Sequence, residues 1–173
     1  NKQGLLNEII KIYGIGENSK EDMIVVPGSE SFLEIGIVDL LLKYKIPCIA
    51  PLQKMAMIET SKAFARNYLQ YNHLSEYQPR YQIFFYLQLE DIKNTIKDYN
   101  YNFVIKADGL CGGKGVRVYN EDNWESSIDY CKELLFNCTY SMHPYKFVIE
   151  ERLFGEEFSL LSFCDGKHIK HMP

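Results

Sequence analysis

The segment from Asp108 to Gly115 concentrates residue types that suit an anionic ligand. Four of its positions are glycines: Gly109, Gly112, Gly113 and Gly115. Lys114 lies among them, and Lys106 precedes them at the end of an apolar run. Because glycine has no Cβ, its backbone N–H can approach a phosphate closely, and a lysine adds compact positive charge. The composition favours a phosphate-binding loop, with a surface hairpin as the alternative, since glycine clusters are common in turns.

Two familiar phosphate motifs do not match this segment. A Walker A loop needs four residues between its first glycine and a Gly-Lys pair, and then Ser or Thr. Here Gly109 and Gly113 are separated by three residues, and Gly115 follows the lysine. A dinucleotide fingerprint needs a helix after its glycines, whereas Val116 to Tyr119 is typical of a strand. The loop is therefore predicted to join two antiparallel strands.

A second group of chemically useful residues lies further along the chain. Four carboxylates surround one glycine: Glu150, Glu151, Glu156 and Glu157. A solvated surface is the plain explanation for such a run. However, Glu150 ends an apolar strand candidate and Glu157 begins another, and carboxylates at strand ends often face a crevice. The pattern therefore keeps a ligand-binding role open beside the surface role.

The elements that must position these residues follow an α/β pattern in the first part of the chain. Met23 to Gly28 and Ile46 to Ala50 are predicted strands, and apolar residues at helical spacing predict a helix from Phe32 to Tyr44 between them. Strand, helix and strand at this spacing predict a βαβ unit, which requires a parallel sheet. Gln53 to Tyr71 is predicted to form one or two helices.

The second part of the chain is richer in strand patterns. Leu74 to Tyr86 is predicted to be irregular. Helices are predicted from Glu90 to Tyr99 and within Glu121 to Phe136. Strands are predicted at Phe103 to Ile105, Val116 to Tyr119, Phe147 to Glu150, Phe158 to Phe163 and His168 to Met172. Asp165-Gly166 is a hairpin signal between the last two.

Composition narrows the class of protein. The 173 residues suffice for one compact domain or two small lobes, and 46% apolar with 24% charged residues excludes disordered, collagen-like and coiled-coil chains. A net charge of -4 argues against a broad nucleic-acid surface. The five cysteines contain no C-x-x-C pair and the four histidines form no ligand pattern, so no metal site is predicted within the chain. No run approaches the length of a membrane span, and a cytoplasmic location is expected.

Four segments, in order, resemble the ATP-grasp ligases and, within them, the phosphoribosylamine-glycine ligase family. VIKADGLCGGKGV is similar to that family's glycine-rich ATP-binding segment, and VIEERLFGEEFSLLSFCDGKH to its hinge and following strand. Upstream, PGSESFLEIGIVDLLLKYKIPCIAP resembles a region of pattern GPE-x-PL-x-x-G-x-x-D, and IETSKAFAR resembles an EGSKAFAK helix. Together these segments cover about Met23 to Pro173.

The resemblance implies an α/β amino-terminal lobe with a parallel sheet, followed by α+β ATP-grasp lobes, with the arrangement truncated at both ends. On this basis residues 1–51 form part of the amino-terminal lobe and residues 52–72 form connecting helices. Residues 73–150 form the small ATP-grasp lobe with the glycine-rich loop, and residues 151–173 begin the second ATP-grasp lobe.

The resemblance also implies ATP-binding roles. Lys106 contacts phosphates, the glycine-rich loop closes over them, and Arg66 replaces a second phosphate-binding lysine of the family. The hinge offers backbone groups and a carboxylate to adenine, and Glu157 holds the ribose hydroxyls. The implied ATP-binding residues are Arg66, Lys106, Gly109, Gly112, Gly113, Lys114, Gly115, Glu150, Glu151, Leu153 and Glu157. Gly28 and Glu30 are assigned to the phosphoribosylamine side.

The implied reaction joins glycine to 5-phosphoribosylamine in purine biosynthesis. ATP phosphorylates the glycine carboxylate, and the amine then attacks the acyl phosphate, with Mg²⁺ or Mn²⁺ neutralising charge. The family's metal and glycine ligands are expected beyond Pro173, so the chain alone is expected to be inactive. Fusion to other purine-biosynthesis enzymes is compatible with the resemblance, whereas nucleic-acid and membrane partners are not expected. The alternatives are another ATP-grasp ligase and a non-catalytic nucleotide-binding module.

Overall fold

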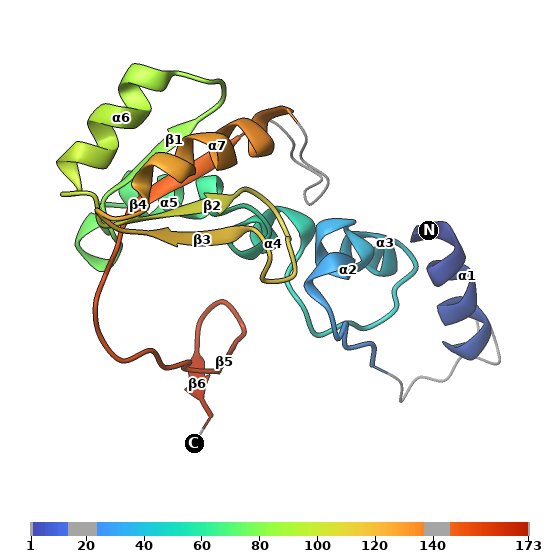
Figure 1. Ribbon diagram of the computed structural model, residues 1–173. Helices are drawn as coiled ribbons and strands as arrows, with labels where there is room; N and C mark the ends of the chain where they lie inside the picture. Colours follow the sequence, from blue (N-terminus) through green and yellow to red (C-terminus); the bar gives the residue numbers. More distant parts are fainter. Residues whose placement is uncertain (1, 14–23, 137–145, 173) are drawn as a thin grey trace.

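The computed structural model describes residues 2–13, 24–136 and 146–172. Figure 1 shows a group of short helices, a sheet covered by helices, and a small hairpin near the carboxyl terminus. The helices are α1 (Lys2–Tyr13), α2 (Glu30–Glu34), α3 (Ile37–Lys43), α4 (Gln53–Thr60), α5 (Lys62–Tyr71), α6 (Leu89–Asp98) and α7 (Ser127–Phe136), with 3₁₀ turns η1 (Ser75–Tyr77) and η2 (Trp124–Ser126). The strands are β1 (Tyr81–Phe84), β2 (Phe103–Ala107), β3 (Val116–Tyr119), β4 (Phe147–Glu151), β5 (Ser162–Cys164) and β6 (Ile169–His171).

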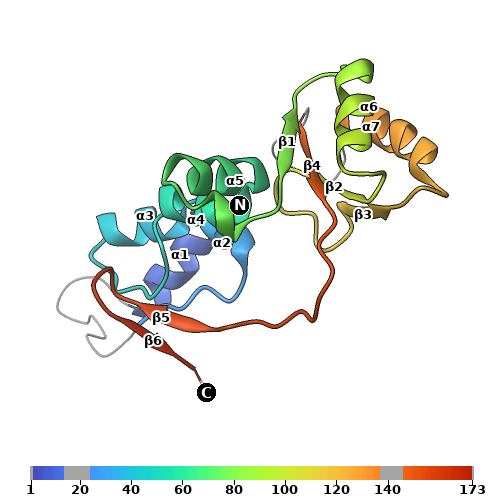
Figure 2. The same cartoon turned by 90° about the vertical axis from the view of Figure 1, so that its left-hand side faces the viewer.

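The main sheet has four antiparallel strands in the order β1-β4-β2-β3. Alternate residues of its central strands point to opposite faces. On one face, Phe103, Ile105, Phe147 and Ile149 are buried in a core with residues of α6 and α7. Helices α6 and α7 cover this face, and α5 lies on the other (Figure 2). The predicted antiparallel pairing around the glycine-rich loop is thereby confirmed.

The parallel sheet expected in the amino-terminal part is not found among the described residues. In the described part of this region, the parallel pairing consists of a single bridge between Val25 and Cys48. The Val25 N–H donates to Pro47 O at 2.9 Å, and the Ile49 N–H donates to Val25 O at 3.0 Å. Met23, the first residue of the expected strand, lies outside the described residues. Prolines beside both segments lack an N–H for a longer ladder, so the pairing stays at one bridge.

The single helix expected from Phe32 to Tyr44 is wrong, because the structure divides it at Gly36. Helix α2 ends before this residue and α3 begins after it, with Gly36 at φ +69°. A Cβ at Gly36 would lie 2.7 Å from Gln53 Oε1. This left-handed conformation suits glycine, and it turns the chain so that α3 packs separately. Of the one or two helices expected within Gln53 to Tyr71, the structure has two, α4 and α5.

Three further differences concern the ends of the chain and the least regular segment. The amino-terminal α1 was not predicted, although Leu5, Leu6, Ile9 and Ile10 repeat at helical spacing and Leu6 is fully buried. Strand β1 lies inside the segment predicted to be irregular. The strand expected from Phe158 to Phe163 is replaced by the shorter β5, which pairs with β6 in an exposed hairpin. One further backbone hydrogen bond, from the Met172 N–H to Leu161 O at 2.9 Å, continues this pairing by one residue, and no strand is assigned to 158–161.

Candidate functional site

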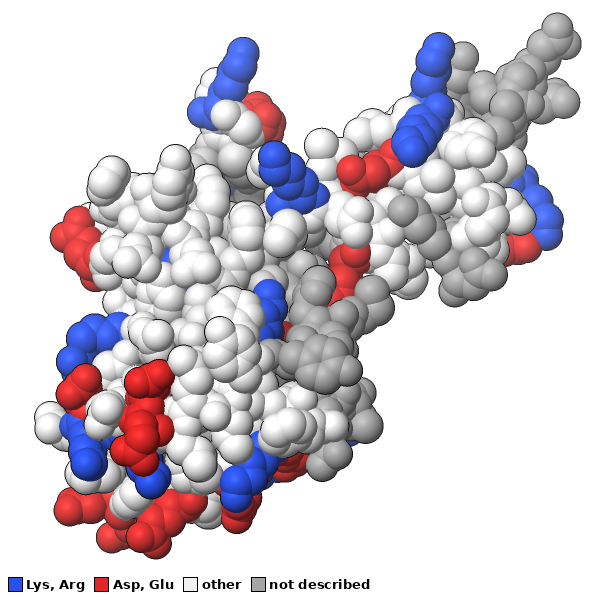
Figure 3. Space-filling view, turned by 90° about the horizontal axis from the view of Figure 1, so that it is seen from above, with Lys and Arg blue, Asp and Glu red and all other residues white. Residues whose placement is uncertain are grey.

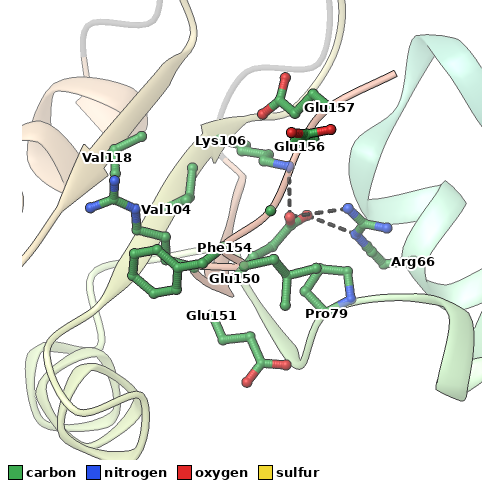
Figure 4. Close-up of a pocket in the computed structure, with 13 residues that line it drawn as sticks. Arg66, Pro79, Val104, Lys106, Val118, Glu150, Glu151, Phe154, Glu156 and Glu157 are labelled. Atoms are coloured by element: carbon green, nitrogen blue, oxygen red, sulfur yellow. Dashed lines mark hydrogen bonds and ion pairs between the residues drawn. The ribbon is translucent and has the colours of Figure 1, made fainter. Parts of the chain in front are cut away.

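Three charged side chains converge on the face of the sheet that α5 covers. Arg66 Nε and Nη2 donate to the two carboxylate oxygens of Glu150 at 2.7 and 3.0 Å. Lys106 Nζ lies 2.6 Å from Glu150 Oε2. Arg66 comes from α5, Lys106 from β2 and Glu150 from β4. The cluster thus joins three elements that are far apart in the sequence, and Figure 4 shows the contacts as dashed lines.

Strand register explains why these residues meet. β2 pairs with β4 so that Val104 lies opposite Glu150 and Lys106 opposite Val148. Because side chains alternate along a strand, these residues share the face opposite to the apolar core. The helix above that face supplies Arg66. A register shift of one residue would move Glu150 into the core.

The Glu150 carboxylate is ionised by its partners despite its burial. Its side chain is 3% exposed, against 20% for Arg66 and 25% for Lys106. Burial raises the pKa of Glu150, but the hydrogen bonds and charges of Arg66 and Lys106 outweigh burial, and the pKa lies below its ordinary value. Two cations therefore share one buried anion, and the cluster keeps a net positive charge.

The cluster forms one wall of a cavity of about 680 Å³. The cavity brings together six of the residues to which the resemblance assigned ATP-binding roles: Arg66, Lys106, Glu150, Glu151, Leu153 and Glu157. The other lining residues are Pro79, Val104, Val118, Arg152, Phe154, Gly155 and Glu156. Apolar strand residues thus lie beside charged groups, a combination that suits a ligand with an apolar ring and anionic groups.

Glu151 differs from its neighbour Glu150. Its carboxylate accepts a hydrogen bond from the Arg80 N–H at 2.8 Å and pairs with Arg80 Nε at 2.6 Å. The Arg80 N–H is the largest cause of a pKa for Glu151 below its ordinary value. In Figure 4 the Glu151 side chain points away from Lys106 and Arg66. Glu151 therefore lines the cavity, but its carboxylate is held by Arg80 and does not join the cluster around Glu150.

The glycine-rich loop is a tight connection between β2 and β3. Gly109, Gly112 and Gly113 have positive φ, which L side chains rarely adopt. The Ala107 N–H donates to Gly115 O at 2.7 Å, closing the base of the loop. A Cβ on Gly115 would lie 2.7 Å from Cys111 Sγ, so this glycine is required by close packing. The side chain of Lys114 is exposed.

A buried carboxylate fastens this loop to α5. Asp108 is fully buried and accepts hydrogen bonds from Ser61 Oγ at 3.0 Å and from the Ala63 N–H at 2.9 Å. Lys146 Nζ lies 2.7 Å from Asp108 Oδ2. Lys62 Nζ also donates to Gly109 O at 2.8 Å. Since α5 carries Arg66, these bonds hold the loop and the charged cluster in one rigid arrangement.

A second cavity of about 380 Å³ lies beside the tip of the loop. Its lining residues come from both the amino-terminal helices and the loop: Ser29, Glu30, Ser31, Glu59, Lys62, Leu110, Cys111, Gly112 and Gly113. The structure therefore brings Glu30 close to the loop glycines. Gly28 is exposed and lines neither cavity, and the same two cavities exclude Gly109, Lys114 and Gly115.

Several residues of the site were missed from the sequence. Val104 and Val118 could have been found, because they alternate with core residues on strands that were predicted. Asp108 was read only as the start of the loop, and Ser61 with Lys62 only as part of a helix motif. Their hydrogen bonds join residues 45 to 47 positions apart, and sequence spacing carries no signal for such contacts.

The wider surface adds little further chemistry. Figure 3 shows acidic and basic side chains mixed over the face seen from above. Among the described residues, no group of three or more His, Cys, Asp or Glu side chains could hold a metal ion. Within the same ranges, no helix has the length and apolar character needed to cross a membrane.

A glycine-rich loop between two antiparallel strands, with paired cations on one wall of a cavity beside the sheet, is typical of an ATP-grasp domain. The family model described as the phosphoribosylglycinamide synthetase ATP-grasp (A) domain matches residues 60–173. The chain belongs to this family.

Relatives support the same assignment. A phosphoribosylamine-glycine ligase of Methanobrevibacter smithii is 36% identical over 174 residues, covering 99% of this chain and 38% of the relative. A bifunctional purine biosynthetic protein of Dictyostelium discoideum is 36% identical over 149 residues, covering 86% of this chain and 18% of that protein. The chain thus spans well under half the length of these relatives.

A solved structure agrees with the fold. The crystal structure of phosphoribosylamine-glycine ligase from Thermotoga maritima superposes with a TM-score of 0.69 at 26% identity. The match covers 100% of this chain and 38% of that structure. The arrangement of helices and sheet described above is therefore shared with a ligase of the same name as the Methanobrevibacter relative.

Proposed function

We propose that this chain is the nucleotide-binding part of an ATP-dependent ligase that joins glycine to 5-phosphoribosylamine in purine biosynthesis. Family membership supports the reaction, and the convergence of Arg66 and Lys106 on one wall of the larger cavity supports the nucleotide. In the proposed reaction, ATP transfers its γ-phosphoryl group to the glycine carboxylate. The amine of phosphoribosylamine then attacks the glycyl phosphate, releases phosphate and forms the C–N bond.

ATP is proposed to lie in the larger cavity. Lys106 and Arg66 have donors left after pairing with Glu150, since an ammonium carries three N–H groups and a guanidinium five. These donors face the cavity and suit phosphate oxygens. The N–H groups of the glycine-rich loop are proposed to close over the same phosphates, with Lys114 adding charge. The chemistry is then mainly positioning and charge neutralisation.

The base and ribose are proposed to lie against the segment after β4. Glu151 and Leu153 line the cavity together with Val104 and Val118, and their backbone groups are proposed to pair with the base. A flat base between apolar side chains and backbone polar groups is a common arrangement in ligand sites. Glu157 is proposed to accept hydrogen bonds from the ribose hydroxyls, because carboxylates pair well with hydroxyl donors.

The smaller cavity is proposed as the side from which phosphoribosylamine approaches. Glu30 lines it together with Gly112 and Gly113 of the loop. A carboxylate and two serine hydroxyls suit an amine and sugar hydroxyls. Gly28 precedes this cavity in the chain. The loop thus lines the proposed amine site, and its N–H groups are proposed to reach the ATP phosphates as well.

The proposal carries further expectations about cofactors and organisation. Mg²⁺ or Mn²⁺ would neutralise the ATP phosphates, with ligands outside the described residues. Residues 1–51 are proposed as part of an amino-terminal lobe, 52–72 as connecting helices, 73–150 as the small ATP-grasp lobe and 151–173 as the start of the second. The protein is proposed to be cytoplasmic, without nucleic-acid or membrane partners, and a fusion like that of the Dictyostelium relative is compatible with it.

Turnover by the full-length protein tests this function. ADP formation from ATP is expected to require both glycine and 5-phosphoribosylamine, and other amino acids are expected to give none. ADP release that depends on a different acid would assign the chain to another ATP-grasp ligase. ATP binding without turnover on any acid would identify a non-catalytic nucleotide-binding module.

A further inference from the structure

Glu150 is the most deeply buried charged residue that lines the larger cavity. Its geometry distinguishes between two possible roles. In one role its carboxylate reads the amino group of the base. In the other it holds the cations that face the phosphates. The side chain is 3% exposed, and both of its oxygens are occupied by Arg66 and Lys106. A group that reads a ligand needs an acceptor open to the cavity. Here Oε2 accepts from both cations and Oε1 from Arg66, and burial leaves almost none of the carboxylate exposed.

The partners of Glu150 show the complementary pattern. Arg66 uses Nε and Nη2 on Glu150 and has no other side-chain partner among the described residues. Lys106 likewise pairs only with Glu150 within those residues. Both cations line the cavity and are a fifth to a quarter exposed. Their remaining N–H groups are therefore available to a ligand, whereas the carboxylate between them is not.

We infer that Glu150 is a positioning residue that holds Arg66 and Lys106 side by side as an anion-binding pair, instead of a group that reads the base. The inference rests on the proposed function of the cavity. Two cations at one wall repel each other, and each has a long flexible side chain with access to water. The shared carboxylate offsets the repulsion and fixes both side chains before a nucleotide arrives. Removing the carboxylate therefore adds positive charge but loses the arrangement.

Loss of arrangement is expected to outweigh the added charge. The cavity is open to solvent, where an extra charge attracts phosphate weakly. A bound triphosphate would then have to immobilise two long side chains that Glu150 holds in advance, and the affinity is expected to fall by about tenfold or more. The role is assigned to positioning because Glu150 acts through Arg66 and Lys106.

The test compares two triphosphates on the full-length protein by calorimetry. ATP and inosine triphosphate carry the same phosphates, but only ATP has an amino group on its base. Glu150→Gln is expected to weaken binding of both by about tenfold, leaving the ratio of their dissociation constants unchanged within about twofold. A changed ratio would mean that Glu150 reads the base, and unchanged or tighter ATP binding would also overturn the inference.

A double-mutant cycle with Lys106 provides the second readout. If Glu150 acts through its cations, Glu150→Gln is expected to weaken ATP binding far less in a Lys106→Gln background than in the wild type. Fully additive losses would overturn the inference. Glu133→Gln is the matched control, since Glu133 pairs with Arg117 at 3.3 Å outside the cavity. It is expected to leave both affinities unchanged.

Two further outcomes keep the inference separate from the proposed function. A wild-type protein that binds neither triphosphate would refute the proposed function and, with it, the inference that rests on it. If Glu150→Gln does not fold, Glu150→Asp replaces it, because the shorter side chain keeps the charge but draws both cations away from the cavity. Glu150→Asp is expected to weaken the binding of both triphosphates by the same factor. Wild-type affinity of this variant for both would overturn the inference.

Discussion

The charge state of Glu150 links the site to the stability of the fold. Burial raises its pKa, but Arg66 and Lys106 lower it more, so the folded pKa lies below the ordinary value of 4.5. A carboxylate of this kind stabilises the folded protein fully above its unfolded pKa and loses that contribution as pH falls through the folded pKa. The contribution of Glu150 is therefore present at neutral pH and disappears in acid.

Glu150→Gln measures this contribution directly. Hydrogen bonds to charged groups contribute about 1.5–3 kcal/mol, and the variant is expected to lose roughly this much at pH 7. Urea unfolding of the variant and the wild type is expected to show a constant difference down to about pH 5, which then shrinks below about pH 4.5. A difference that stays constant through pH 3 would contradict the pKa assignment.

Gly115 is expected to be the least replaceable glycine of the loop on packing grounds. A Cβ there would meet Cys111 Sγ at 2.7 Å and Ala107 Cβ at 3.0 Å. Overpacking of this kind costs about 1–3 kcal/mol, so Gly115→Ala is expected to lower the free energy of unfolding by that amount. Gly155→Ala is the control, because nothing lies within 4 Å of a Cβ at Gly155. Equal effects of the two substitutions in denaturant unfolding would contradict the packing argument.

Helix α5 is the element on which the site depends. Its amino terminus is capped twice, since Ser61 Oγ accepts from the Phe64 N–H at 3.1 Å and Asp108 accepts from the Ala63 N–H at 2.9 Å. The first cap is local, and the second comes from the end of β2. Through Asp108, the position of Arg66 on the helix is tied to the strand that carries Lys106.

Two substitutions compare the cap of α5 with its connection to the sheet. Ser61→Ala removes the local cap and one of the donors to Asp108, and it is expected to lower the free energy of unfolding by about 1–2 kcal/mol. Asp108→Ala leaves Lys146 and several donors without their buried partner and is expected to cost about 3–5 kcal/mol. Chemical denaturation measures both. A smaller loss for Asp108→Ala than for Ser61→Ala would contradict the proposed connection.

Local patterns predicted the elements wherever those patterns were strong. Helix α6 and strands β2, β3 and β4 follow from periodicity and turn residues, and the structure confirms them. Gly36 was not recognised as a break, because a single glycine inside a helical pattern is often tolerated. Strand β1 was missed because its residues, Tyr81–Phe84, pair with β4, and that partner lies far away in the sequence. Tertiary pairing decides such segments.

The site could be predicted only in part for the same reason. The glycine-rich loop, Lys106 and the carboxylates after β4 were found because residue type and spacing carry their chemistry. The contact between Arg66 and Glu150 depends on how α5 sits on the sheet and on the register of β2 with β4. The same holds for Asp108, whose partners are on α5. These contacts belong to packing and have no signature in a single sequence.

In the molecule as a whole, α5 contributes to both cavities, through Arg66 to the larger and through Lys62 to the smaller. The larger cavity contains the charged cluster, and the smaller one adjoins the amino-terminal helices and the glycine-rich loop. Ligands bound in the two cavities would therefore both contact this helix. The proposed ligase must bring its ligands together in this way, since a phosphoryl group has to pass from ATP toward the second substrate without escaping to water.

Thermal unfolding of the full-length protein with and without Mg-ATP tests the nucleotide site most directly, alongside Lys106→Ala. A ligand at a hundredfold excess over its dissociation constant stabilises the native state by about 2.7 kcal/mol, so ATP is expected to raise the melting temperature clearly. The increase is expected to disappear in Lys106→Ala and to persist in Lys132→Ala, a control on α7 where the lysine pairs with Asp129. An unchanged melting temperature, or an increase that survives in Lys106→Ala, would contradict an ATP site at Lys106.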